Sequence, residues 1–129
     1  MIDVRLEGQE ALNDILDDAD GVAHLRPPME RATLRLQADM AKYPRQRSGA
    51  KNRRTGELGR RWTRRISTVG GGIDGWVGNN ASYGPYVQSA QRQAWMHRGV
   101  WQTDEDVLNR HRAEIVADFE RAIQGALRG

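Results

Sequence analysis

The sequence predicts an α+β domain, in which a small antiparallel sheet with a β-hairpin packs against two to three amphipathic helices, the last of them long. Residues 2–7 and 62–69 alternate with the two-residue period of strands. Apolar residues recur every three or four positions over 29–43 and 108–127, which is the period of a helix. Nine of the 14 glycines lie between Gly49 and Gly84 and favour turns and strands there. A chain of 129 residues fits one domain, spanning 1–129.

The N-terminal third is predicted to form a strand and two helices. Residues 2–7 form the strand, and apolar residues at helical spacing over 11–16 form a first helix that the acidic stretch 17–21 ends. Acids at the C-terminal end of a helix oppose its dipole, so this helix is expected to be short. The second helix is expected to open at Pro27-Pro28, because proline is tolerated in a first turn, and to stop before Pro44.

A basic stretch and a hairpin follow. Residues 44–56 are polar and basic, and we expect them to form a mobile arm. Residues 56–61 are expected to make a turn or a short helix. The hairpin joins 62–69 to a second strand at 73–77, and the triple glycine at 70–72 can supply the positive φ of its turn.

The C-terminal third begins with an irregular aromatic segment, residues 83–101, in which a short helix is expected over 87–92. Thr103 has the side chain of an N-cap, and Asp106 follows three residues later. Acidic residues next to the cap favour a helix N-terminus. An apolar stripe from Leu108 to Leu127 predicts a last helix that runs nearly to the end of the chain.

The residues that usually carry chemistry are sparse. The absence of cysteine excludes disulfides and thiolate chemistry. His24, His97 and His111 include no close pair, so a zinc or iron site is not expected, and His111 is interpreted as a half-buried packing residue of the last helix. The triple glycine lacks the lysine of a phosphate loop, and no serine has a nucleophile context. We expect neither an enzyme nor a cofactor.

Nothing in the sequence predicts a membrane protein. The chain has no apolar run long enough to cross a bilayer and no secretory signal, so synthesis in the cytoplasm is expected.

Positive charge is concentrated in residues 42–65. Ten basic residues and one acid, Glu57, give this stretch a net charge of +9, whereas the whole chain carries +3. A local block of this size is typical of a tail, a nucleic-acid patch or a partner contact. Arginines on either side of Trp62 can bind phosphates while the indole ring stacks on a base.

A subunit contact is favoured over that DNA interpretation. Strand alternation places the arginines on both faces of a strand, and no known nucleic-acid-binding module is present. Guanidinium groups are well suited to protein interfaces. The arginines assigned to a subunit or partner interface are Arg53, Arg54, Arg60, Arg61, Arg64 and Arg65. A nonspecific DNA-binding module that uses residues 42–65 stays as an alternative, and the residues assigned to DNA in a channel are Arg45, Arg47 and Lys51.

Four tryptophans and a single phenylalanine are an unusual balance for a small core. Trp76, Trp95 and Trp101 can pack in the core, which is expected for at least two of them, or serve as hot spots of a protein–protein contact. The balance favours an interface in the 83–101 segment. The aromatic residues assigned to it are Tyr83, Tyr86, Trp95 and Trp101.

Several short motifs occur in a characteristic order along almost the whole chain. They are Ile-x-Val-x-Leu-x-Gly at 2–8, Tyr43-Pro44, Arg-Thr-Gly-Glu-Leu at 54–58, Trp-Val-Gly-Asn at 76–79, Ala-Ser-Tyr-Gly-Pro-Tyr-Val-Gln at 81–88, and the stretch 93–103 before the last helix. In this order they resemble the small tail-component family of long-tailed bacteriophages, described as tail-completion, neck or head–tail joining proteins. Many members of that family carry Glu-Gly after the Tyr-Val pair, where this chain has Gln88-Ser89-Ala90.

The resemblance implies a non-enzymatic structural protein of the virion, synthesised in a bacterial host. Related neck proteins form rings, commonly hexamers or dodecamers, and a hexamer is the expectation here. The implied partners are other copies of the chain and the adjacent neck and tail proteins, namely a head connector or stopper and a tail terminator or tail tube. DNA passing through the channel is a transient, nonspecific contact. A tail terminator or head-closure ring protein is the alternative within the same particle.

Overall fold

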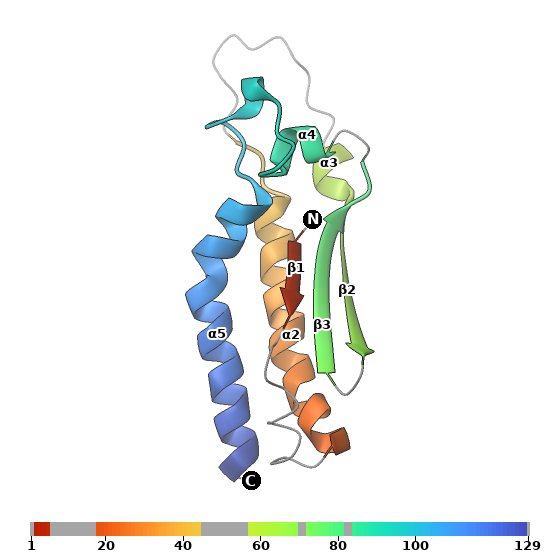
Figure 1. Cartoon of the computed structure of the whole chain (residues 1–129), viewed down its shortest axis with the longest axis vertical. Coiled ribbons are helices and arrows are strands. Elements are labelled where there is room, and N and C mark those ends of the chain that lie inside the picture. The colour runs from red at the N-terminus through yellow and green to blue at the C-terminus, as the bar shows by residue number, and fades with distance from the viewer. Residues whose placement is uncertain (1, 6–17, 45–56, 70–71, 82–83, 129) are drawn as a thin grey trace.

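The computed structural model describes residues 2–5, 18–44, 57–69, 72–81 and 84–128, and these residues form an α+β fold (Figure 1). The fold class predicted from the sequence is therefore confirmed. In chain order the elements are β1 (Ile2–Arg5), α2 (Asp18–Met40), α3 (Glu57–Arg60), β2 (Trp62–Val69), β3 (Gly72–Asn79), α4 (Gly84–Gln88), the 3₁₀ helix η1 (Trp95–His97) and α5 (Asp104–Arg128).

The sheet has three antiparallel strands in the order β1-β3-β2. β2 and β3 form the predicted hairpin, with Trp62 opposite Asn79 and Val69 opposite Gly72. The N-terminal strand pairs with the other side of β3, with Ile2 opposite Val77. The central strand is therefore β3, the second strand of the hairpin. The two outer strands, β1 and β2, lie far apart in the sequence.

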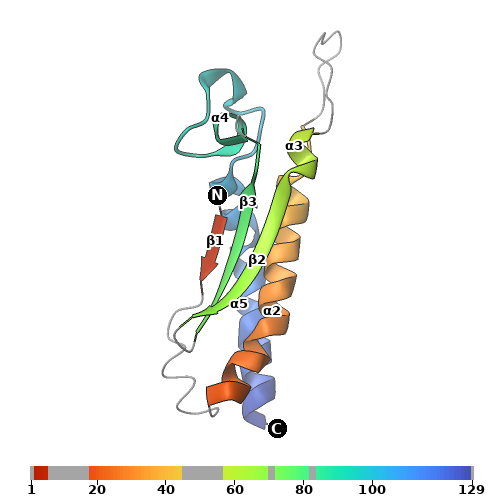
Figure 2. The same cartoon turned by 90° about the vertical axis from the view of Figure 1, so that its right-hand side faces the viewer.

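Helices α2 and α5 lie side by side along one face of the sheet (Figures 1 and 2). α2 makes its most extensive contacts with α5 and with the two strands of the hairpin, so it packs between the sheet and α5. The main cluster of buried side chains lies between these layers, and a smaller one is formed by Leu58, Ala81 and Val87. The main cluster comprises Leu25, Met29, Ala32, Leu36, Met40, Trp62, Ile73, Val77, Val107, Ile115 and Phe119. Burying each of the larger ones contributes about 1.5–3 kcal/mol relative to exposure.

Ion pairs reinforce the contact between α2 and α5. Arg31 donates through two nitrogens to the carboxylate of Asp118, at 2.7 and 2.9 Å. One turn further, Arg35 lies 2.8 Å from Glu114. These pairs are partly exposed, so they align the two helices while the apolar core supplies most of the stability.

The start of α2 differs from the prediction. The helix begins at Asp18, so Pro27 and Pro28 lie well inside it instead of in its first turn. In an ordinary helix, N–H groups at these two positions would donate to the carbonyls of Ala23 and His24. Both residues are exposed, so water can donate to these carbonyls instead. Burial of Leu25 and Pro28 on the same stretch outweighs the local cost. The helix expected over 11–16 lies outside the described residues.

Two further predictions concern short helices. The one expected over 56–61 is confirmed as α3. The one expected over 87–92 was wrong in position, because α4 covers Gly84–Gln88 and the chain then continues in turns. Pro85 falls in the first turn of α4, where its fixed φ and missing N–H suit a helix start.

The N-cap of α5 is confirmed. The N–H of Asp106 donates to the Thr103 hydroxyl at 3.2 Å, and the N–H of Thr103 donates to the Asp106 carboxylate at 3.0 Å. This reciprocal arrangement satisfies two backbone donors at the helix start. The apolar stripe of α5 is buried at Ile115 and Phe119, whereas Leu127 is exposed near the end of the helix.

Gly75 allows α2 to approach the sheet closely. A Cβ atom at this position would lie 2.5 Å from Met29 Sδ and 2.7 Å from Thr33 Cγ2. Both neighbours are buried, so neither can move away without disturbing the core. The central strand therefore needs glycine here for a packing reason.

We expect Gly75→Ala to lower the free energy of unfolding by about 1–3 kcal/mol, because overpacking forces side chains out of their rotamers. Gly125→Ala is the matched control, since nothing lies within 4 Å of its Cβ position in α5. This control should stabilise the protein by up to about 1 kcal/mol. Urea denaturation measures both, and an equal effect of the two substitutions would contradict the close approach at Gly75.

Candidate functional site

The segment between α4 and α5 exposes large apolar side chains. Tyr86 is 53% exposed, Trp95 77%, Met96 58% and Val100 40%. We refer to these four residues as the exposed apolar set. They make up four of the seven exposed large hydrophobic residues in the described part of the chain, although their segment is short. Figure 1 shows this segment gathered at one end of an elongated molecule.

Glutamine side chains hold this segment in place. The Gln93 amide donates to the carbonyls of Val87 (2.7 Å), Trp101 (3.0 Å) and His97 (3.3 Å). The buried Gln88 amide donates to the carbonyl of Met40 at 3.2 Å, which links α4 to the end of α2. The segment has little regular secondary structure, and these bonds satisfy carbonyls that a helix or sheet would otherwise pair.

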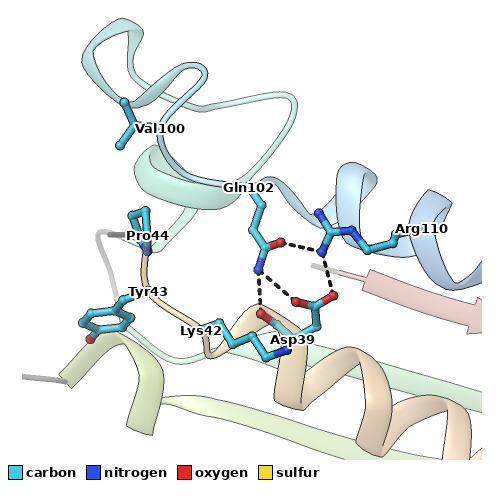
Figure 3. Close-up of a pocket in the computed structure, with 7 residues that line it drawn as sticks. All are labelled: Asp39, Lys42, Tyr43, Pro44, Val100, Gln102 and Arg110. Atoms are coloured by element: carbon cyan, nitrogen blue, oxygen red, sulfur yellow. Dashed lines mark hydrogen bonds and ion pairs between the residues drawn. The ribbon is translucent and has the colours of Figure 1, made fainter. Parts of the chain in front are cut away.

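Asp39, in the last turn of α2, connects the segment to both long helices. Its side chain is 9% exposed. One carboxylate oxygen accepts from Arg110 at 2.8 Å, and the other lies 3.3 Å from the Gln102 amide (Figure 3). The oxygen that accepts from Arg110 also lies 2.7 Å from His111 Nε2. An ionised carboxylate only accepts hydrogen bonds, so His111 must carry a proton on Nε2.

The hydrogen bonds decide the charge of Asp39. Burial by itself would raise the pKa of this carboxyl, but the bonds from His111, Gln102 and Arg110, with the charge of Arg110, bring the pKa below its ordinary value. The bond from Arg31 likewise lowers the pKa of Asp118, against the opposing effect of burial. Both carboxylates are therefore ionised in the folded protein at neutral pH.

The predicted interface arginines that the structure describes lie on α3, on β2 and in the turn that joins them. Arg60, Arg61, Arg64 and Arg65 are all exposed, and we call these four residues together the arginine surface, although the alternation of β2 places Arg64 and Arg65 on opposite faces of the sheet. The Arg65 guanidinium lies 5.2 Å from the centre of the Trp76 ring, a cation–π distance, on the sheet face away from α2. Trp62 is 7% exposed and packs in the core, so its ring is not available for the base stacking considered in the alternative DNA interpretation.

The predicted aromatic interface is brought together only in part. Tyr86 and Trp95 are exposed, as an interface requires. Trp101 is half-buried and its ring meets Tyr43 edge-on, at 5.2 Å between ring centres. The remaining residues assigned from the sequence lie outside the described residues: Arg45, Arg47, Lys51, Arg53, Arg54 and Tyr83.

Sequence reasoning missed Asp39, Arg110 and the three glutamines. Asp39 sits beside an apolar stripe that gave no hint of a buried charge, and its partner His111 was interpreted as a packing residue. His111 is indeed half-buried, but it also bonds to Asp39. A buried acid, which must find donors, is the signal that links these residues once burial is known.

The Asp39 cluster contains residue types that serve in acid–base catalysis, but the hydrogen-bonding capacity of its carboxylate is already used within the protein. Both carboxylate oxygens already have donors, and Arg110 and Gln102 are bonded to each other at 2.8 Å. Among the described residues, no group of three or more His, Cys, Asp or Glu side chains is arranged to hold a metal ion. In the same part of the chain, no helix has the length and apolarity to cross a membrane. We therefore interpret the cluster as structural: its hydrogen bonds position the segment before α5.

No protein-family model, curated protein or solved structure matches this chain.

We expect Asp39→Asn to lower the free energy of unfolding by about 1.5–3 kcal/mol at neutral pH, because hydrogen bonds to a charged, buried group are lost. A folded-state pKa below the ordinary value contributes stability above about pH 4 that is lost as pH falls through the lowered pKa. The deficit of the variant should therefore shrink on acidification. Chemical denaturation across this pH range measures it, and a deficit independent of pH would contradict the charged cluster.

Proposed function

We propose that the chain is a non-enzymatic structural protein of a phage or prophage neck, which assembles into a ring that joins the head connector to the tail or completes the tail end. The observation that carries this proposal is the exposed apolar set held in a fixed geometry. The order of motifs along the sequence, which resembles tail-completion and neck proteins, supplies the biological setting.

Exposed aromatic side chains in a fixed conformation are suited to binding protein. Trp95 is more than three-quarters exposed, and covering a side chain of this size contributes about 1.5–3 kcal/mol. Tryptophan and tyrosine are enriched at interface hot spots. The glutamine and Asp39 bonds order the segment before any partner arrives, so association costs less conformational entropy.

A ring also needs two different surfaces on each subunit, because a heterologous contact repeats one surface against another. The exposed apolar set and the arginine surface are chemically distinct, and they come from different elements of the fold. In this proposal each copy presents one to its neighbour or to the adjacent neck and tail proteins, and the protein resides in the virion. A tail terminator or head-closure ring would use the same two surfaces.

We expect the double substitution Trp95→Ala with Met96→Ala to weaken self-association at least about tenfold, because two central apolar contacts are removed. Leu34→Ala is the matched control, since Leu34 is 48% exposed but lies on α2. Light scattering at matched concentrations gives the oligomer mass, and thermal melting checks that the subunit stays folded. An oligomer of unchanged mass in the double variant would overturn the proposed use of the exposed apolar set.

The arginine surface also supports a second candidate, a nonspecific DNA-binding module. Its four guanidinium groups are exposed, and such a surface attracts phosphates in a salt-dependent way. In the neck proposal, DNA is only a transient contact in the channel.

The two candidates differ in the effect of reversing the arginine surface to glutamate. For a ring subunit, we expect the reversal to abolish assembly while the monomer stays folded, and duplex binding by the unchanged protein to be weak and lost with added salt. Light scattering and a DNA retardation assay at two salt concentrations measure these outcomes. Intact assembly of the reversed variant, together with tight duplex binding by the unchanged protein, would favour the DNA module.

A further inference from the structure

A pocket of about 350 Å³ opens at the junction of α2, the segment before α5 and α5 itself (Figure 3). Lys42 and Arg110 contribute its two cationic side chains. Tyr43, Pro44 and Val100 provide its apolar part. A pocket of this size with a few convergent polar groups has the usual form of a ligand site.

Arg110 is held ready for an anion. One terminal nitrogen of its guanidinium donates both to Asp39, at 2.8 Å, and to Gln102, at 2.8 Å. The other terminal nitrogen and Nε have no hydrogen-bond partner among the residues that the structure describes. A planar guanidinium whose position is already fixed can offer two parallel N–H groups to a carboxylate.

Lys42 adds a second positive charge that is not neutralised within the described part of the chain. Its side chain is exposed and makes no ion pair there. Asp39 balances one of the two cations that line the pocket, so the lining carries one net positive charge. A single carboxylate would balance it.

We propose that this pocket binds the carboxylate of an acidic side chain on a partner protein. The methylene stem of a glutamate fits against Val100 and Pro44 while its carboxylate reaches Arg110 and Lys42. The inference deepens the proposed function, on which it rests, because it assigns the acidic residue to the same partner that covers the exposed apolar set.

Two observations favour a protein carboxylate as the occupant. Val100 belongs both to the pocket and to the exposed apolar set, so a partner covering one surface reaches the other. The stretch of this chain that follows Pro44, residues 45–56, contains no aspartate or glutamate and cannot supply the anion. Repeated phosphates are better matched by the arginine surface, which lies on α3, on β2 and in the turn that joins them.

The test is a titration of the full-length chain with N-acetylglutamate amide, followed by NMR. We expect saturable shifts centred on Val100, Gln102 and the Arg110 side chain, and none with N-acetylglutamine amide, which lacks the charge. Lys42→Met should weaken binding about threefold to tenfold, because one cation is lost. Arg128→Met is the matched control, since it removes one exposed charge at the far end of α5 and should leave binding unchanged.

Three results would overturn the inference: no saturable shift, equal shifts with the glutamine analogue, or stronger binding of inorganic phosphate than of the glutamate probe. The titration needs no assembly, so its outcome is independent of the light-scattering test. Saturable glutamate binding, together with an oligomer of unchanged mass in the variant Trp95→Ala with Met96→Ala, would keep the pocket and overturn the proposed use of the exposed apolar set. The opposite pair of results would reject only the pocket.

Discussion

The carboxylate of Asp39 is the interaction on which the arrangement of this protein depends. It is almost fully buried, and taking a charge out of water is unfavourable unless donors surround it. Arg110 and His111 from α5 and Gln102 from the preceding segment provide those donors. One side chain therefore fixes where α2 ends relative to where α5 begins, and it orders the connection between them.

The main role of this cluster is to select one packing arrangement of α2 and α5, more than to add stability. The apolar layer between the sheet and the helices would hold α2 and α5 together in several rotations, because burial of apolar surface has no direction. Hydrogen bonds to Asp39 select one of them. The pairs Arg31–Asp118 and Arg35–Glu114 act in the same sense further along the helices. The exposed apolar set can then keep one geometry although its segment has little regular secondary structure.

Much of the fold could be predicted from the sequence where local chemistry decides the structure. The Thr103 cap, the hairpin pairing of 62–69 and the stripe of α5 all depend on neighbours a few residues apart. The start of α2 could not be predicted, because packing of Leu25 and Pro28 against distant elements outweighs the local preference of proline for a first turn. The Asp39 cluster was hidden for the same reason, since its side-chain partners lie 63 to 72 residues away. The exposure of Tyr86 and Trp95 was expected from the sequence. The burial of Trp62 was not, because it depends on how β2 pairs with β3 and which face of the sheet the ring therefore occupies.

The two prolines inside α2 have a mechanical consequence. Two consecutive backbone hydrogen bonds are missing at this point, so fewer bonds than in an ordinary helix join the turns on either side of the prolines. Bending is therefore easiest at this point, although the buried side chain of Leu25 ties the turn before Pro27 to the same core as Met29 and Leu36. The prolines place the weakest point of α2 near its start, far from Asp39 in its last turn and from the segment that Asp39 orders (Figure 1).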